Sequence, residues 1–258
     1  MTDLRVSPPA GTPDQSIKKM PVFQLNQEII FPAPELAEPD GLIAVGGDLS
    51  PERLLAAYRL GIFPWFGKGD PILWWTPSPR LVLYPEEFHI SRRLARILRQ
   101  NIFSLTADHA FKEVIMNCAA KRATKRTDTW ITREMVDAYC LLHERGYAHS
   151  IECWQDGRLA GGVYGISLGR VFFGESMFSH RSNASKIALN GLARLAMHKG
   201  IALIDCQMRT DHLVSLGARE ISRISFQQHL RTYIPELIPQ NKWKLDLTGR
   251  GETGPADA

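Results

Sequence analysis

The hydrophobic pattern of residues 150–204 changes from alternating to helical and back, and this change limits the possible folds more than any other feature. Three alternating segments predict strands, with turns at Asp156-Gly157 and Leu168-Gly169. A helical pattern follows, and then a continuous apolar run that is typical of a buried strand. The predicted elements are strands over Ser150–Trp154, Leu159–Ser167 and Val171–Gly174, a helix over Asn183–His198 and a strand over Ile201–Ile204.

This order of elements indicates a mixed sheet. A helical crossover requires the last strand to lie parallel to the third strand. Three antiparallel strands, a helix and a parallel strand form the core of the acetyltransferase-like (GNAT) fold. We therefore predict an α+β protein with a GNAT-like mixed-sheet domain. The chain has 258 residues, of which 44% are hydrophobic, and this is sufficient for a buried core.

The rest of the chain suggests a division into domains. Residues 21–80 are dense in Pro, Gly and Trp, and they contain one clear helix that Ser50 caps and Gly61 ends. We expect a flexible extension over residues 1–20, a small N-terminal α/β domain over 21–80, the GNAT-like domain over 81–247 and a flexible tail over 248–258.

Three helices are expected between residues 81 and 150. One begins after a cap at Asp108, and another runs from Thr132 to Gly146. The first, from Arg92 to Gln100, has one apolar face and one arginine face, the latter formed by Arg92, Arg96 and Arg99. These arginines either bind along a nucleic-acid phosphate backbone or form a solvated face. No acidic residue stands four positions away to pair with them, which favours phosphate binding.

Two segments carry polar groups that could support chemistry. On a strand, Asp205 and Gln207 would share one face and Cys206 the other, so the acid and the amide could relay a proton together. Alternatively, Asp205 caps the following turn and Gln207 is solvated. Glu175 stands among aromatic residues, where a carboxylate is costly unless it is paired or used; the alternative is a surface turn.

A serine nucleophile is a further candidate in this segment. Gly174–Phe178 resembles the GxSxG elbow, with His180, His212 and Asp205 as possible triad partners. Phe178 replaces the last glycine that the tight turn needs, so the sequence disfavours this interpretation.

The aromatic segments Gly61–Phe66 and Ile72–Trp75 could stack unpaired bases or join two domains.

The four cysteines show no CxxC or zinc spacing, so we expect reduced thiols and no metal. The net charge of +4 permits a polyanionic partner without requiring one. Residues 1–19 lack the apolar core of a signal peptide and no run is long enough to span a bilayer, which predicts a cytoplasmic protein.

An acyl-CoA enzyme of this fold would need a glycine-rich pyrophosphate loop before the crossover helix. Ser179–Lys186 contains no R/QxxGxG/A pattern, which points to a donor other than acyl-CoA. An acyl-CoA-dependent N-acetyltransferase and a non-catalytic tRNA-binding module remain the alternative functions.

Several stretches together resemble the bacterial leucyl/phenylalanyl-tRNA–protein transferase family, over about residues 23–230. They are Phe31-Pro32, Gly41–Ser50, Gly61–Phe66, Ile72–Pro77, Thr129–Thr132, Gly174–Ser179, Asn183–Lys186, Ile204–Gln207 and Ser215–Ala218. The resemblance implies an aminoacyltransferase that moves Leu or Phe from tRNA to proteins with N-terminal Arg or Lys and so marks them for degradation. It implies no metal or organic cofactor, and we expect a monomer.

The resemblance also implies roles for individual residues. Asp205 and Gln207 would lie at the reacting centre, with Glu175 at the pocket edge. Our own hypothesis for the mechanism is that Gln207 accepts a hydrogen bond from the attacking amine. Asp205 would polarise Gln207 and help to shuttle the proton to the departing ribose hydroxyl. The pocket for the adenosine and the aminoacyl group would include Trp65, Trp130, Phe172 and Met177, and the tRNA acceptor stem would lie on Arg92, Arg96 and Arg99.

Overall fold

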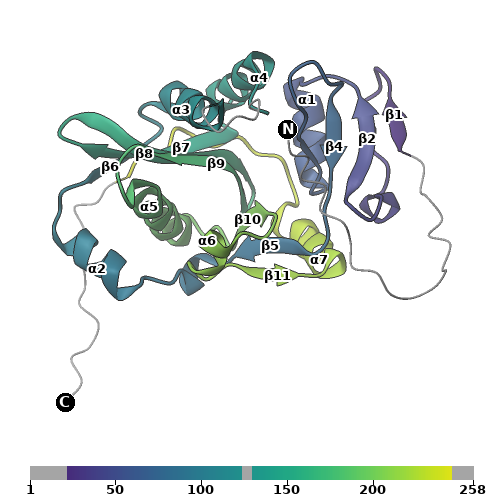
Figure 1. Cartoon of the computed structure of the whole chain (residues 1–258). Helices are drawn as coiled ribbons and strands as arrows, with labels where there is room; N and C mark the ends of the chain where they lie inside the picture. The colour runs from purple at the N-terminus through teal and green to yellow at the C-terminus, as the bar shows by residue number, and fades with distance from the viewer. Residues whose placement is uncertain (1–21, 124–129, 246–258) are drawn as a thin grey trace, which may run out of the picture.

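A computed structural model describes residues 22–123 and 130–245, and these residues form two sheets (Figure 1). The extension expected over residues 1–20 and the tail expected over 248–258 lie outside the described residues. The smaller sheet has the strand order β1-β2-β4-β3 and the larger one the order β11-β5-β10-β9-β8-β7-β6.

The smaller sheet comes from the Pro- and Trp-rich part of the sequence. Its strands are β1 (Phe23–Leu25), β2 (Leu42–Gly46), β3 (Phe63–Pro64) and β4 (Leu73–Trp75). The helix α1 (Pro51–Arg59) begins where predicted, because the side chain of Ser50 accepts the Arg53 N–H and Pro51 needs no N–H partner. A short 3-10 helix, Pro34–Leu36, lies between β1 and β2.

The larger sheet contains the predicted crossover. Its strands are β5 (Arg80–Leu83), β6 (Ser104–Ala107), β7 (Ala148–Gln155), β8 (Arg158–Leu168), β9 (Val171–Ser179), β10 (Leu203–Gln207) and β11 (Arg219–Ile221). Strand β10 lies parallel to β9, with Leu203 opposite Val171, and α5 (Ala184–His198) connects them. The predicted α+β class and GNAT-like strand order are therefore confirmed. Strand β9 continues to Ser179 instead of ending at Gly174.

Helices cover both faces of the larger sheet (Figure 1). On one face lie α3 (Phe111–Ala123) and α4 (Arg133–Glu144), and on the other lies α5, against which α2 (Arg92–Arg99) packs. The remaining helices are the 3-10 helix Pro85–Glu87, α6 (Asp211–Val214) and α7 (Arg223–Tyr233). None of the helices in the described ranges is long and apolar enough to cross a bilayer.

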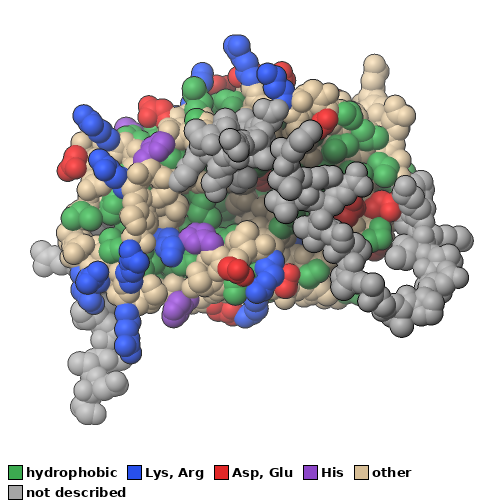
Figure 2. Space-filling model, in the orientation of Figure 1, with side chains coloured by type: hydrophobic (Ala, Val, Ile, Leu, Met, Phe, Trp, Pro, Cys, Tyr) green, Lys and Arg blue, Asp and Glu red, His purple; other side chains and the backbone are tan. Residues whose placement is uncertain are grey.

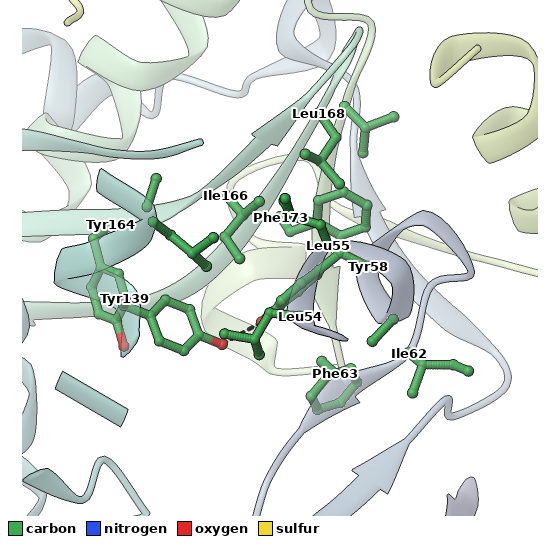
Figure 3. Packing of buried hydrophobic residues seen from close by; sticks show 14 of the residues in the cluster. Leu54, Leu55, Tyr58, Ile62, Phe63, Tyr139, Tyr164, Ile166, Leu168 and Phe173 are labelled. Carbon is green, nitrogen blue, oxygen red and sulfur yellow. Dashed lines mark hydrogen bonds between the residues drawn. The ribbon is translucent and has the colours of Figure 1, made fainter. Parts of the chain in front are cut away.

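The buried core on the α3–α4 face continues into the smaller sheet. Tyr58 of α1 packs edge-on against Phe173 of β9, with 5.2 Å between ring centroids. Figure 3 shows Tyr58 and Tyr139 with their hydroxyls directed at one another inside this core. One continuous core therefore connects the two sheets, and side chains from both can reach the same cavity.

The expected cap at Asp108 is wrong. Asp108 has a positive φ of 54° and is buried, and its carboxylate turns away from α3. It accepts the Ser150 N–H at 2.8 Å and the Trp243 N–H at 2.6 Å, and it lies 2.7 Å from Nδ1 of His149. His149 stacks on Trp243 at 4.1 Å. These long-range partners override the local preference of aspartate for a helix start.

Candidate active site

A cavity of about 540 Å³ lies where β9 and β10 part. The register of the two strands ends at Asp205 opposite Phe173, and β9 continues beyond this point without β10. Both strands, α5 and the segment after β3 contribute to the wall. The lining is mainly apolar, with few polar side chains, as is typical of small-ligand sites. The lining includes Trp65, Trp130, Glu175, Met177, Gln207 and His212.

The end of β10 departs from regular strand geometry. Gln207 has a φ of 56°, and the pairing with β5 shifts between Asp205 and Gln207. This bulge turns Cys206 and Gln207 toward the cavity and leaves Asp205 outside its lining. The predicted alternation, with Asp205 and Gln207 on one face and Cys206 on the other, is therefore wrong.

Asp205 is fully buried and paired with Arg80. The Nε and Nη2 atoms of Arg80 donate to the two carboxylate oxygens at 2.8 and 2.7 Å. Oδ1 also accepts the Gln207 N–H at 3.0 Å, and Nε2 of Gln207 lies 3.4 Å from Oδ2. Guanidinium donors therefore already occupy both oxygens of this carboxylate. The contacts suit orientation of Gln207 better than the proton transfer expected of Asp205.

Arg80 is a functional candidate that the sequence analysis missed. Its guanidinium is buried between the rings of Phe63 and Phe226, at 5.0 and 4.7 Å from their centroids. Nη1 has no hydrogen-bond partner among the described residues. An arginine directly before the apolar run Leu81–Leu83 was a signal, because a charged residue in a buried strand needs a partner.

Glu175 lies in the cavity wall between two buried tyrosines. Tyr58 donates to Oε1 at 2.7 Å and Tyr139 to Oε2 at 3.1 Å, and the two hydroxyls also contact each other. Burial raises the pKa of Glu175 to about 7, although both hydrogen bonds oppose the rise. Sequence analysis found neither tyrosine, because they lie 117 and 36 residues from Glu175 along the chain.

The predicted pocket residues divide into two groups. Trp65, Trp130 and Met177 line the cavity together with Glu175 and Gln207. Trp65 is 38% exposed and lies 5.8 Å, edge-on, from Trp75.

Phe172 is placed elsewhere. It is fully buried, lies outside the cavity lining and is 5.7 Å from the Trp243 ring. Phe172 packs in the same buried cluster as Leu189, Leu192 and Ile204, which line the cavity. Asp205 contacts the side chain of the cavity residue Gln207, so both residues support the wall from behind.

The serine-nucleophile interpretation does not fit this geometry. Gly174–Phe178 lies inside the extended strand β9, and Ser176 is buried. A nucleophile elbow needs a sharp turn from strand to helix. The turn before α5 covers His180–Asn183 and contains no glycine. Within the described ranges, no group of three or more His, Cys, Asp or Glu side chains could hold a metal ion.

The arginine face of α2 is exposed. Ser91 caps the helix, Leu94 is buried, and Arg92, Arg96 and Arg99 point to solvent. These arginines make no ion pair with any described residue. The apolar face packs on α5, the helix that supplies Leu189 and Leu192 to the cavity. Figure 2 shows Lys and Arg side chains gathered on the side of the molecule where α2 lies.

The crossover β9–α5–β10, with a cavity where its strands part, gives this chain the architecture of transferases of GNAT-like fold. The family described as "Leucyl/phenylalanyl-tRNA protein transferase" matches residues 82–231, and its N-terminal domain matches residues 47–78. The chain belongs to the leucyl/phenylalanyl-tRNA–protein transferase family.

Relatives that carry this family name are similar over nearly their whole length. The protein from Syntrophobacter fumaroxidans is 56% identical over 87% of this chain and 96% of its own. The protein from Anaeromyxobacter sp. strain Fw109-5 is 51% identical over 90% of this chain and 98% of its own. Among solved structures, a GCN5-related N-acetyltransferase from Kribbella flavida matches at 10% identity and a TM-score of 0.36, over 67% of this chain and 61% of that one.

Proposed function

We propose that this chain transfers Leu or Phe, and also Met, from aminoacyl-tRNA to the N-terminal Arg or Lys of acceptor proteins, and that the new peptide bond marks them for degradation. The observation that carries the proposal is the cavity. It combines a mainly apolar wall with polar side chains that include Glu175 and Gln207, and with the exposed indole of Trp65. The family relatives carry the name of this activity.

The donor tRNA would use the cavity and α2 together. In this proposal the terminal adenosine stacks on Trp65 and Trp130, because every base offers a π face to an aromatic ring. Trp65 belongs to the small N-terminal domain that we propose for residues 21–80. The Leu or Phe side chain enters the apolar part of the cavity, next to Met177. The acceptor stem lies along the exposed arginines of α2, which bind backbone phosphates without reading sequence.

The reaction needs no nucleophilic residue, because the aminoacyl ester is already activated. The acceptor amine attacks the ester carbonyl while the Gln207 carboxamide oxygen accepts a hydrogen bond from it. Asp205 acts through Gln207: it accepts the Gln207 N–H at 3.0 Å while Arg80 holds both of its oxygens. Orientation of the two substrates at one carbonyl then provides most of the rate acceleration. We expect the protein to work as a monomer in the cytoplasm without a metal or an organic cofactor.

The rival activity is acetyl transfer from acetyl-CoA. The turn over His180–Asn183 before α5 has no glycine to bring the backbone close to a pyrophosphate, which disfavours this activity. A third possibility is a module that binds tRNA without reacting.

One assay distinguishes these functions. The full chain is incubated with radiolabelled Leu-tRNA and a peptide that begins with Arg, and labelled peptide is measured. We expect transfer to this peptide, little transfer to a matched peptide that begins with Gly, and no inhibition by excess acetyl-CoA. Binding of Leu-tRNA without transfer would indicate the binding module, and acetylation of the peptide from acetyl-CoA would indicate the acetyltransferase.

A further inference from the structure

The carboxylate of Glu175 is held by side chains from three separate elements. Tyr58 from α1 and Tyr139 from α4 each donate to one of its oxygens, while Glu175 itself belongs to β9. Both tyrosines are fully buried, and Figure 3 shows their hydroxyls converging within the core. Two buried donors on one half-buried carboxylate fix its direction and leave its exposed side in the cavity wall.

Glu175 is also close to the reacting end of β10. Phe173 pairs with Asp205 in register, so Glu175 is two residues further along β9, just past the point where the strands part. The charged and titratable groups that face it are Tyr58, Tyr139, Asp205 and Arg80. Arg80 neutralises Asp205 through both carboxylate oxygens, which leaves Glu175 as the carboxylate available to a cavity ligand.

Two other titratable side chains line the cavity. Burial raises the pKa of the Cys206 thiol well above its ordinary value, so it stays protonated. His212 comes from α6, and burial together with the neighbouring charge of Lys186 lowers its pKa. His212 is therefore the competing base among the residues that line the cavity.

We propose that Glu175 is the proton acceptor for the α-ammonium group of the acceptor protein, and that Tyr58 and Tyr139 are positioning residues which hold its carboxylate toward the cavity. This inference rests on the proposed aminoacyl transfer. It gives the proton a destination that Asp205 does not offer, since Asp205 is fully buried outside the cavity lining and is paired with the Arg80 guanidinium.

The step balances without another reactant. The α-ammonium gives one proton to Glu175, and the free amine attacks the ester carbonyl carbon. A C–N bond forms and the C–O bond to the tRNA ribose breaks. The second proton of the attacking nitrogen moves to the ribose oxygen, which leaves as a hydroxyl. Glu175 then returns its proton to water, and the carboxylate is restored.

Burial and the two tyrosine hydrogen bonds act on Glu175 in opposite directions. Burial raises its pKa to about 7, so that near neutral pH a large share of the protein has the carboxylate form. A group titrating near the working pH suits general-base catalysis. Each tyrosine stabilises that form, so removal of either hydroxyl raises the pKa further. The acidic limb of the kcat–pH profile should then move to higher pH.

The test is the pH dependence of kcat for transfer from Leu-tRNA to the Arg peptide, measured with wild type, Glu175→Gln, Tyr58→Phe and Tyr139→Phe. Tyr147→Phe is the matched control, because its hydroxyl donates to the Leu237 carbonyl at 3.4 Å and not to the cavity. Glu175→Gln should lower kcat about 100-fold or more and abolish the acidic limb. Tyr58→Phe and Tyr139→Phe should each move the limb upward by about one pH unit, and the control should keep the wild-type profile.

A second variant, Glu175→Ala, distinguishes the loss of the proton acceptor from misfolding. Glu175→Ala should bind Leu-tRNA with wild-type affinity, and added formate should restore part of its transfer, because the cavity can admit a small carboxylate. Wild-type kcat and an unchanged acidic limb in Glu175→Gln would overturn the proposal. So would a raised KM for the peptide at unchanged kcat, since Glu175 would then only bind the acceptor cation. A wild-type protein that transfers nothing would instead overturn the proposed function.

Discussion

The buried pair of Arg80 and Asp205 yields a prediction about stability that separates folding from activity. Replacing Arg80 by Met keeps most of the side-chain length but leaves Asp205 charged and unpaired at 0% exposure. Breaking a buried pair in this way costs about 3–5 kcal/mol. Nη1 of Arg80 has no partner among the described residues, so the pair is incompletely satisfied. We therefore expect the lower end, about 3 kcal/mol, in the free energy of unfolding.

The assay is urea denaturation of wild type and Arg80→Met, followed by fluorescence. Arg145→Met is the matched control, because Arg145 donates to Glu52 over the same 2.7 Å but with side chains 45% and 57% exposed. Exposed ion pairs contribute little, so the control should change stability far less. A loss of under about 1 kcal/mol in Arg80→Met would refute the reasoning, since it would mean that water reaches Asp205.

A double variant completes this prediction. In Arg80→Met with Asp205→Leu, no charge stays buried, so much of the lost stability should return. Transfer activity should remain low, because no carboxylate accepts the Gln207 N–H and the left-handed conformation of Gln207 is left unsupported. Recovery of both stability and activity would show that the pair only supports the core.

Three further predictions concern the proposed function and the acid in the cavity. Changing Arg92, Arg96 and Arg99 together to Ala should weaken tRNA binding and reduce its salt dependence, measured by filter binding at several salt concentrations; unchanged binding would make α2 a solvated face. Val- and Ile-tRNA should be poor donors beside Leu-tRNA in the transfer assay, because a slot shaped for unbranched β-carbons excludes them, and efficient Val transfer would contradict that shape. The folded-state pKa of Glu175 is raised from 4.5 to about 7, so its contribution to stability is present below pH 4.5 and is lost as pH rises to 7. Urea titrations across this range should therefore show wild type losing stability relative to Glu175→Gln as pH rises, and parallel curves would contradict the raised pKa.

The sequence was sufficient for the core of the larger sheet. Alternating and helical periods predicted β7, β8, α5 and the parallel strand β10, because each pattern depends on residues a few positions apart. The cap at Ser50 was equally local. The helix expected from Thr132 also begins there, because the Thr132 side chain accepts the Met135 N–H. The cap at Asp108 failed, since its partners Ser150 and Trp243 are 42 and 135 residues away.

The candidate site was less predictable for the same reason. Trp65, Trp130, Glu175, Met177 and Gln207 were expected in one pocket and do line one cavity. The bulge at Gln207 depends on how Arg80, 125 residues from Asp205, holds the strand end. Strand alternation assumes regular pairing on both sides, and here the pairing of β10 with β9 ends at Asp205, two residues before Gln207.

The stacking of Trp243 on His149 has a practical consequence for anyone who shortens or tags this protein. Trp243 stacks on His149 of β7, and its backbone N–H donates to Asp108, a residue more than a hundred positions earlier. A deletion that removes Trp243 would take its buried indole out of the core and expose the imidazole of His149. Purification tags are better joined after Trp243, so that the stacking of this tryptophan on His149 is kept.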